Sequence, residues 1–211
     1  MVTDKATTRA KGTPKSTKGC PKNVLDKMSQ GELAVVLRVL LKEHPDLKPK
    51  AEAIAVEMVS SPSVEDIAEE VYQAVTFLDL DSLNDRAGSH SWDYVEPTEA
   101  AWELLDEAVE DVVADMKRRM ELELHSAAET ICHGIVVGLN KAKGVKSDGL
   151  LGWAPDFPAE EACHVVAELI RTCPVEKCGA VRNRLVEVLG DLVPEWHERI
   201  SRAAEDAARK R

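Results

Sequence analysis

Aromatic residues are scarce in this sequence: Phe, Trp and Tyr make up only 4% of it, so Leu, Val, Ile and Ala must fill any core. It contains no run of about 18 apolar residues, and we therefore expect no membrane span. The first residues lack the apolar centre of a secretory signal. The five cysteines, an odd number at irregular spacing, favour free thiols in a reducing compartment over a disulfide framework. These absences together predict a cytoplasmic protein without membrane contact.

The sequence also lacks the short motifs of common active sites. It has no GxSxG, no helical HExxH, no Walker A loop and no GxGxxG phosphate loop. The acidic residues of 98–116 are not accompanied on that helix by the Glu-x-x-His pair of a di-iron bundle. We therefore predict no catalytic residue and no cofactor, and we favour a non-enzymatic role.

Acidic residues outnumber basic ones by 38 to 27, which gives a formal net charge of −11. Such a surface repels nucleic acids and anionic membranes on average. Residues 1–27 have the opposite balance, with seven basic residues against two acidic ones and few large apolar side chains. We expect a disordered basic arm there. It is suited either to lie against the acidic remainder of the chain or to contact nucleic-acid phosphates, and both interpretations remain open.

The apolar residues recur with a helical period almost throughout the rest of the chain. Ser29 and Glu32 have the spacing of a capping box, and apolar residues follow at i, i+3, i+4, i+7 and i+8 from Leu33 until His44-Pro45 ends the pattern. Similar patterns predict about eight amphipathic helices. They lie between Ser29 and His44 and over 48–60, 63–78, 98–124, 126–142, 159–172, 175–190 and 194–209.

These helices predict an all-α fold, with one helical domain over residues 28–211. Short turns between successive helices favour an irregular helical-hairpin array in the style of HEAT or tetratricopeptide proteins, although no clean repeat occurs. We expect long loops at 79–97 and 143–158, because the helical period is lost there. Gly134 and Gly138 lie four residues apart on one predicted helix, which favours close approach of a neighbouring helix.

Aromatic side chains gather in the two predicted loops. Trp92 and Tyr94 lie in the first, and Trp153 and Phe157 lie in the second beside Asp156 and two prolines. Aromatic residues in such loops bind partner proteins at hot spots, but they also seal the ends of helical cores. The sequence favours the core-sealing role, above all for residues 152–158, and these five residues are our candidates if the loops bind a partner.

Two Cys-His pairs are the alternative candidates for a metal site. Cys132-His133 and Cys163-His164 offer the ligand types that zinc prefers. Neighbours on a helix point about 100° apart, so the four side chains do not converge easily, and we predict no metal. Cys173 and Cys178 are too far apart for a redox CxxC motif, and whether they pair is left open.

Three stretches carry a resemblance to known proteins: SQGELAVVLRVLLKEHPDL, DLDSLNDRAG with SWDYVEPTEAAWELLDEAV, and LGWAPDFPAEEA. Together they resemble an uncharacterised bacterial family of all-helical proteins. The first stretch is also similar to the helical regions that accompany SWIM-type zinc fingers. The Cys-x-Cys and Cys-x-His pairs of that finger do not occur here, so the resemblance implies a helical fold but no zinc or nucleic-acid role for any residue.

The sequence thus favours a non-catalytic helical scaffold or adaptor that binds another protein. One alternative is an accessory protein that contacts nucleic acid through residues 1–27. A second alternative is a metal-binding protein or enzyme of unknown class that uses the two Cys-His pairs.

Overall fold

The computed structural model describes residues 23–89, 94–145 and 149–210. The described chain is helical apart from one pair of very short strands, which confirms the all-α prediction. It divides between Glu52 and Ala53 into two units, and each is described here by itself. The predicted arm over 1–27 lies outside the described residues except for its last five, which include the 3₁₀ turn η1 (Leu25–Lys27).

The first unit contains α1 (Gln30–Glu43), the 3₁₀ turn η2 (Pro45–Leu47) and the start of α2 (Lys48–Val59). The predicted capping box is confirmed: the Ser29 amide donates to Glu32 Oε2 at 2.9 Å, and the Glu32 amide donates to Ser29 Oγ. The helix ends at His44, next to Pro45, as the sequence predicts. No residue of α1 or α2 is buried, although both helices were expected to be amphipathic.

The second unit contains the remaining helices and the two strands. Its elements are α3 (Val64–Thr76), α4 (Leu80–Arg86), β1 (Gly88–Ser89), β2 (Tyr94–Val95), α5 (Pro97–Glu121), α6 (His125–Lys143), α7 (Leu150–Trp153), α8 (Phe157–Thr172), α9 (Val175–Leu192), η3 (Pro194–Trp196) and α10 (His197–Arg209).

The described residues form ten α-helices where about eight were expected. The additional ones, α4 and α7, lie in the two predicted loops. The first loop also contains the antiparallel pair β1–β2, in which Gly88 lies opposite Val95 and Ser89 opposite Tyr94. The loss of the helical period leaves room for one short helical turn in 79–97, but helices of seven and four residues are too short for a period to define their bounds.

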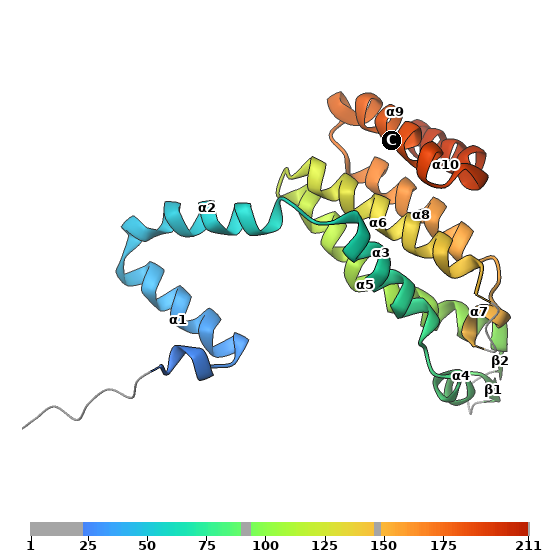
Figure 1. Cartoon of the computed structure of the whole chain (residues 1–211), viewed down its shortest axis with the longest axis horizontal. Coiled ribbons are helices and arrows are strands. Elements are labelled where there is room, and N and C mark those ends of the chain that lie inside the picture. Colours follow the sequence, from blue (N-terminus) through green and yellow to red (C-terminus); the bar gives the residue numbers. More distant parts are fainter. Residues whose placement is uncertain (1–22, 90–93, 146–148, 211) are drawn as a thin grey trace, which may run out of the picture. The chain divides into compact units, whose positions relative to one another are not determined.

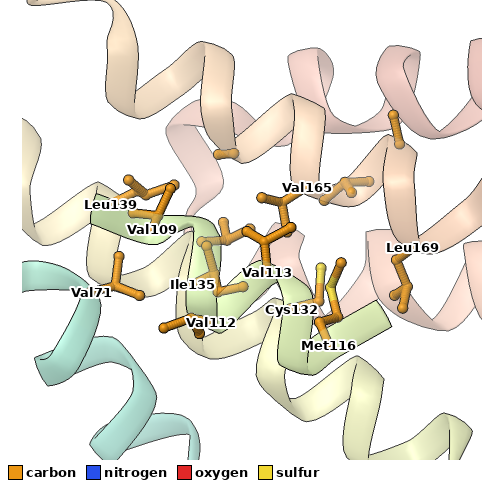
Figure 2. Close-up of a cluster of buried hydrophobic side chains, with 14 of the residues drawn as sticks. Val71, Val109, Val112, Val113, Met116, Cys132, Ile135, Leu139, Val165 and Leu169 are labelled. Atoms are coloured by element: carbon orange, nitrogen blue, oxygen red, sulfur yellow. The ribbon is translucent and has the colours of Figure 1, made fainter. Parts of the chain in front are cut away.

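Helix α6 lies at the centre of the second unit, with α3 and α8 on either side of it, and α5 packs against all three (Figure 1). Apolar side chains from these four helices meet in one cluster, which includes Val71, Val113, Ile135 and Val165 (Figure 2). The apolar stripe of α6 is buried from Ala128 to Leu139. Helices α9 and α10 pack against each other, and α10 packs against α8.

Two glycines of α6 allow α3 to approach closely, as the sequence predicts. A Cβ atom on Gly134 would lie 2.5 Å from Ile67 Cβ, and one on Gly138 would lie 2.6 Å from the carbonyl oxygen of Ala68. Because non-bonded heavy atoms do not approach this closely, any larger residue would push α3 away from α6. The residue type at these two positions therefore sets the distance between the two helices.

Candidate functional site

A group of exposed apolar side chains lies on α1 and η2, in the first unit. Seven large apolar residues there are 36–54% exposed, and they form what we name the N-terminal apolar set: Leu33, Val35, Val36, Leu37, Val39, Leu40 and Leu47. Single exposed apolar residues are normal on protein surfaces, whereas a group of this size marks an interaction surface. The N-terminal apolar set is therefore our candidate functional site.

Helix α1 carries apolar residues on two sides. Leu33, Val36, Leu37 and Leu40 form the stripe that the sequence analysis identified, and Val35 and Val39 lie on another side. A helix that is apolar on more than one side is usually covered by other helices or by a partner from several directions. The second stripe was not predicted from the sequence, although Val35 and Val39 have the i, i+4 spacing that indicates one side of a helix.

Charges of both signs accompany the N-terminal apolar set. Residues 29–59 contain five acidic residues and four basic ones, whereas residues 60–211 contain 31 acidic and 16 basic ones. Among the described ion pairs, Lys48 and Glu52 of α2 lie 3.7 Å apart. This segment is therefore nearly neutral, in contrast to the acidic sequence that follows it.

The candidate residues of the two aromatic loops differ in burial. Tyr94 and Trp153 are 54% and 49% exposed, and Asp156 is exposed beside α8, whereas Phe157 is completely buried. Trp92 lies outside the described residues. Tyr94, Trp153 and Asp156 are accessible to a partner, but Phe157 is part of the core.

Phe157 joins α8 to α5 by an aromatic contact. Its ring lies 5.0 Å from the ring of Trp102, with the two planes inclined by 72°. This edge-to-face geometry is a favourable one for two aromatic rings. Phe157 is thus buried in the core, as the core-sealing role favoured from the sequence requires.

Trp102 also lines an acidic groove between α5 and α8. The groove has a volume of about 520 Å³ and is lined by Trp102, Glu103, Asp106, Glu160, Glu161 and His164. The buried Glu161 carboxylate lies 3.2 Å from Nδ1 of His164, whose own side chain is about half exposed. Burial raises the pKa of Glu161, and His164 opposes that effect. The groove therefore carries a carboxyl group that ionises less readily than its exposed neighbours.

The four alternative metal ligands lie in different environments. Cys132 is buried in the core, and burial raises the pKa of its thiol. His133 is partly buried, and burial lowers its pKa. Cys163 is partly buried and His164 lies at the acidic groove. Over 23–89, 94–145 and 149–210, no three His, Cys, Asp or Glu side chains are grouped as metal ligands.

The other described cysteines are also buried, wholly or in part. Cys173 and Cys178 are both buried, and no disulfide joins them to each other. Burial also raises the pKa of Cys163, so this thiol is a weak nucleophile at neutral pH. The described thiols thus have the character of core residues.

No helix in the described part of the chain combines the length and the hydropathy that a bilayer crossing needs. Comparison with family models, with curated proteins and with solved structures finds no match to this chain. The resemblance of the three sequence stretches to a bacterial helical family therefore stays an expectation.

Proposed function

We propose that this chain is a non-catalytic helical adaptor that binds another protein through α1. The observation that carries the proposal is the contrast between the two units. Helices α3, α5, α6 and α8 bury their apolar stripes against one another, whereas α1 and α2 have apolar side chains but no buried residue. An uncovered apolar group of this size supports a role in binding.

The energetics of α1 support the same proposal. An isolated helix of about 12–15 residues is only marginally stable in water, and α1 has 14 residues. Its capping box stabilises the first turn by only about 1 kcal/mol. Contact with a partner would supply the packing that maintains most protein helices.

The apolar surface contributes to the free energy of association. Burying one large apolar side chain completely contributes about 1.5–3 kcal/mol. The seven residues of the N-terminal apolar set are 36–54% exposed, so covering them contributes about 5–9 kcal/mol. Association itself costs about 4–15 kcal/mol, so this burial offsets much of the cost, and the apolar surface that the partner buries adds to the gain.

We also propose that the helices form an irregular helical-hairpin array and that the chain belongs to the bacterial helical family that its sequence resembles. Arrays of paired helices commonly present helix faces to protein partners. The all-helical fold is compatible with such an array, and Tyr94 and Trp153 offer further accessible aromatic contacts at one end of the second unit. The N-terminal apolar set remains the principal binding surface in this proposal.

Affinity purification of variants tests the proposal. The full chain carries a tag, is cross-linked in its own cells, and is recovered with the proteins bound to it. Val36→Glu with Leu40→Glu places two carboxylates in the N-terminal apolar set, and Val175→Glu places one on α9 at a residue that is 78% exposed. We expect at least one protein, a second copy of the chain included, to be lost with the double variant and kept with the control.

An identical set of bound proteins for the wild type, the double variant and the control would overturn the proposal. Circular dichroism checks that all three chains keep the same helix content. Because Val36 and Leu40 are not buried, the double variant should leave the core of the second unit intact.

A further inference from the structure

We infer that the contact between α6 and α9 is sensitive to acid: protonation of His133 releases α9 from the core of the second unit. This inference goes beyond the proposed function, because it concerns a conformational change of the second unit and not the binding surface on α1. It is carried by an unpartnered ring nitrogen beside the Glu129–Arg184 ion pair and by the small buried part of α9.

Glu129 and His133 lie one helical turn apart on α6, so their side chains project from the same side of the helix. Both oxygens of the Glu129 carboxylate already accept hydrogen bonds from Arg184 of α9. The Nε2 atom of His133 is buried and has no hydrogen-bond partner within the described part of the chain. The contact therefore offers this nitrogen no acceptor if it gains a proton.

Protonation of His133 would place a positive charge in this contact. The charged groups that act on the ring are Glu129 on α6 and Arg184 on α9, and Cys173 at the end of α8 acts in turn on Arg184. Burial lowers the pKa of His133, Glu129 opposes that effect, and Arg184 adds to it. A buried N–H of an imidazolium without an acceptor is costly, so the charged ring favours a state in which α9 has moved away.

Helix α9 is attached to the core by few buried side chains. Four of its 18 residues are buried, whereas ten of the 16 residues of α8 are buried. It lies at the edge of the second unit beside α10, and α10 packs directly against α8 (Figure 1). Displacing α9 thus leaves the contact between α8 and α10 in place.

The pH dependence has a definite direction. Because the pKa of His133 is lowered while α9 is docked, the contact is fully present above the pKa of a solvated histidine, about 6.5. It is lost as the pH falls below that value, and one proton raises the ratio of displaced to docked α9 by about 10-fold at most for each pH unit. The contact should therefore hold at about pH 7.5 and weaken at about pH 5.5.

Methyl NMR spectra of the full chain between about pH 7.5 and about pH 5.5 test the inference. The signals of Val181 and Leu185, which are buried on α9, should shift reversibly as the pH falls. Those of Ile170 on α8 and Ile200 on α10 should change little over the same range. The ring signals of His133 report its own titration, whose midpoint should match that of the α9 signals.

His133→Gln and His133→Phe cannot gain the proton, so at about pH 5.5 the ratio of displaced to docked α9 should be about 10-fold lower than in the wild type. His164→Gln on α8, where the native ring is about half exposed, should keep the wild-type response of α9. Spectra at about pH 7.5 check that each variant folds. The two replacements of different size separate the loss of the proton from a change in packing.

Three results would overturn the inference. The first is a response of the α9 signals that both His133 variants keep. The second is a titration of the His133 ring without any shift of the α9 signals. The third is a shift of Ile170 and Ile200 with the same midpoint as α9, because the whole second unit would then unfold together.

Discussion

The carboxylate of Glu129 on α6 accepts two hydrogen bonds from the guanidinium of Arg184 on α9, at 2.7 Å from Nε and 2.5 Å from Nη2. The two side chains differ in environment, since that of Glu129 is 6% exposed and that of Arg184 is 55% exposed. The pair connects two helices whose residues are 55 positions apart in the sequence. Removing the guanidinium of Arg184 should therefore lower the free energy of unfolding more than neutralising the carboxylate of Glu129.

Arg184→Met should lower the free energy of unfolding by about 3 kcal/mol, because it leaves the buried Glu129 carboxylate without its ion pair. Glu129→Gln should cost only about 1 kcal/mol, because the amide still accepts a hydrogen bond and Arg184 is solvated. Urea unfolding of each variant measures the difference. Arg182→Met serves as the control, because this partly buried neighbour on α9 donates its hydrogen bonds to Asn183 and not to a buried carboxylate. Equal costs for Arg184→Met and Glu129→Gln would contradict this assignment.

Gly138→Ala should destabilise the protein by about 1–3 kcal/mol, because the new methyl group would lie 2.6 Å from the Ala68 carbonyl oxygen. Gly179→Ala on α9 is the matched control, since nothing lies within 4 Å of the added Cβ atom. It should stabilise by about 0.5–1 kcal/mol, because Ala is the better helix former. The midpoint temperature of thermal unfolding should thus fall for Gly138→Ala and rise for Gly179→Ala. Two shifts of the same sign would show that the contact between α3 and α6 is not tight.

Phe157→Ala should lower the free energy of unfolding by about 3–5 kcal/mol, because it removes a completely buried ring and its contact with Trp102. Trp153→Ala, four residues earlier, should cost much less, since Trp153 is 49% exposed. Denaturant unfolding compares the two. A larger loss for Trp153→Ala would mean that the sealing ring of this segment is Trp153.

Glu161→Gln should stabilise the protein more at about pH 7 than at about pH 4. Burial raises the pKa of Glu161 in the folded state. Because the pKa is raised in the folded state, the folded state binds this proton more tightly than the unfolded state does. The stability that Glu161 contributes is therefore fully present below its unfolded pKa, about 4.3, and is lost as the pH rises through its folded pKa. Glu161→Gln does not ionise and so avoids this loss of stability, which denaturant midpoints of both chains between these pH values measure.

Glu110→Gln, on an exposed position of α5, is the control for this pH dependence. It should leave the pH profile of stability close to that of the wild type. A Glu161→Gln profile parallel to the wild-type profile would mean that Glu161 does not ionise within the range.

Most helices could be predicted from the sequence, because their apolar period and their prolines are local signals. Pro97 and Pro158 lie in the first turns of α5 and α8, near the predicted positions. The short helix α4 was missed because a period needs more than seven residues, although Asp79 accepts a hydrogen bond from the Asp81 amide at its start. A local cap without a following period was not sufficient to identify the helix.

The candidate site was harder to predict, because an apolar stripe does not indicate what covers it. The same spacing describes Leu37 on α1, which is 49% exposed, and Leu139 on α6, which is completely buried. Phe157 and Trp153 likewise share one proline-containing segment and differ only in burial. The Glu129–Arg184 pair joins distant parts of the sequence, and no local pattern indicates such a contact.

The central position of α6 determines how the second unit opens for hydrogen exchange. Helix α6 packs against α3, α5, α8 and α9, whereas α4 packs mainly against α5. Detaching α6 requires all four neighbours to separate, so its backbone amides should exchange with deuterated solvent only when the whole unit opens. Amides of α4 should exchange through local fraying, and the ratio of the two rates reports how cooperatively residues 53–211 hold together.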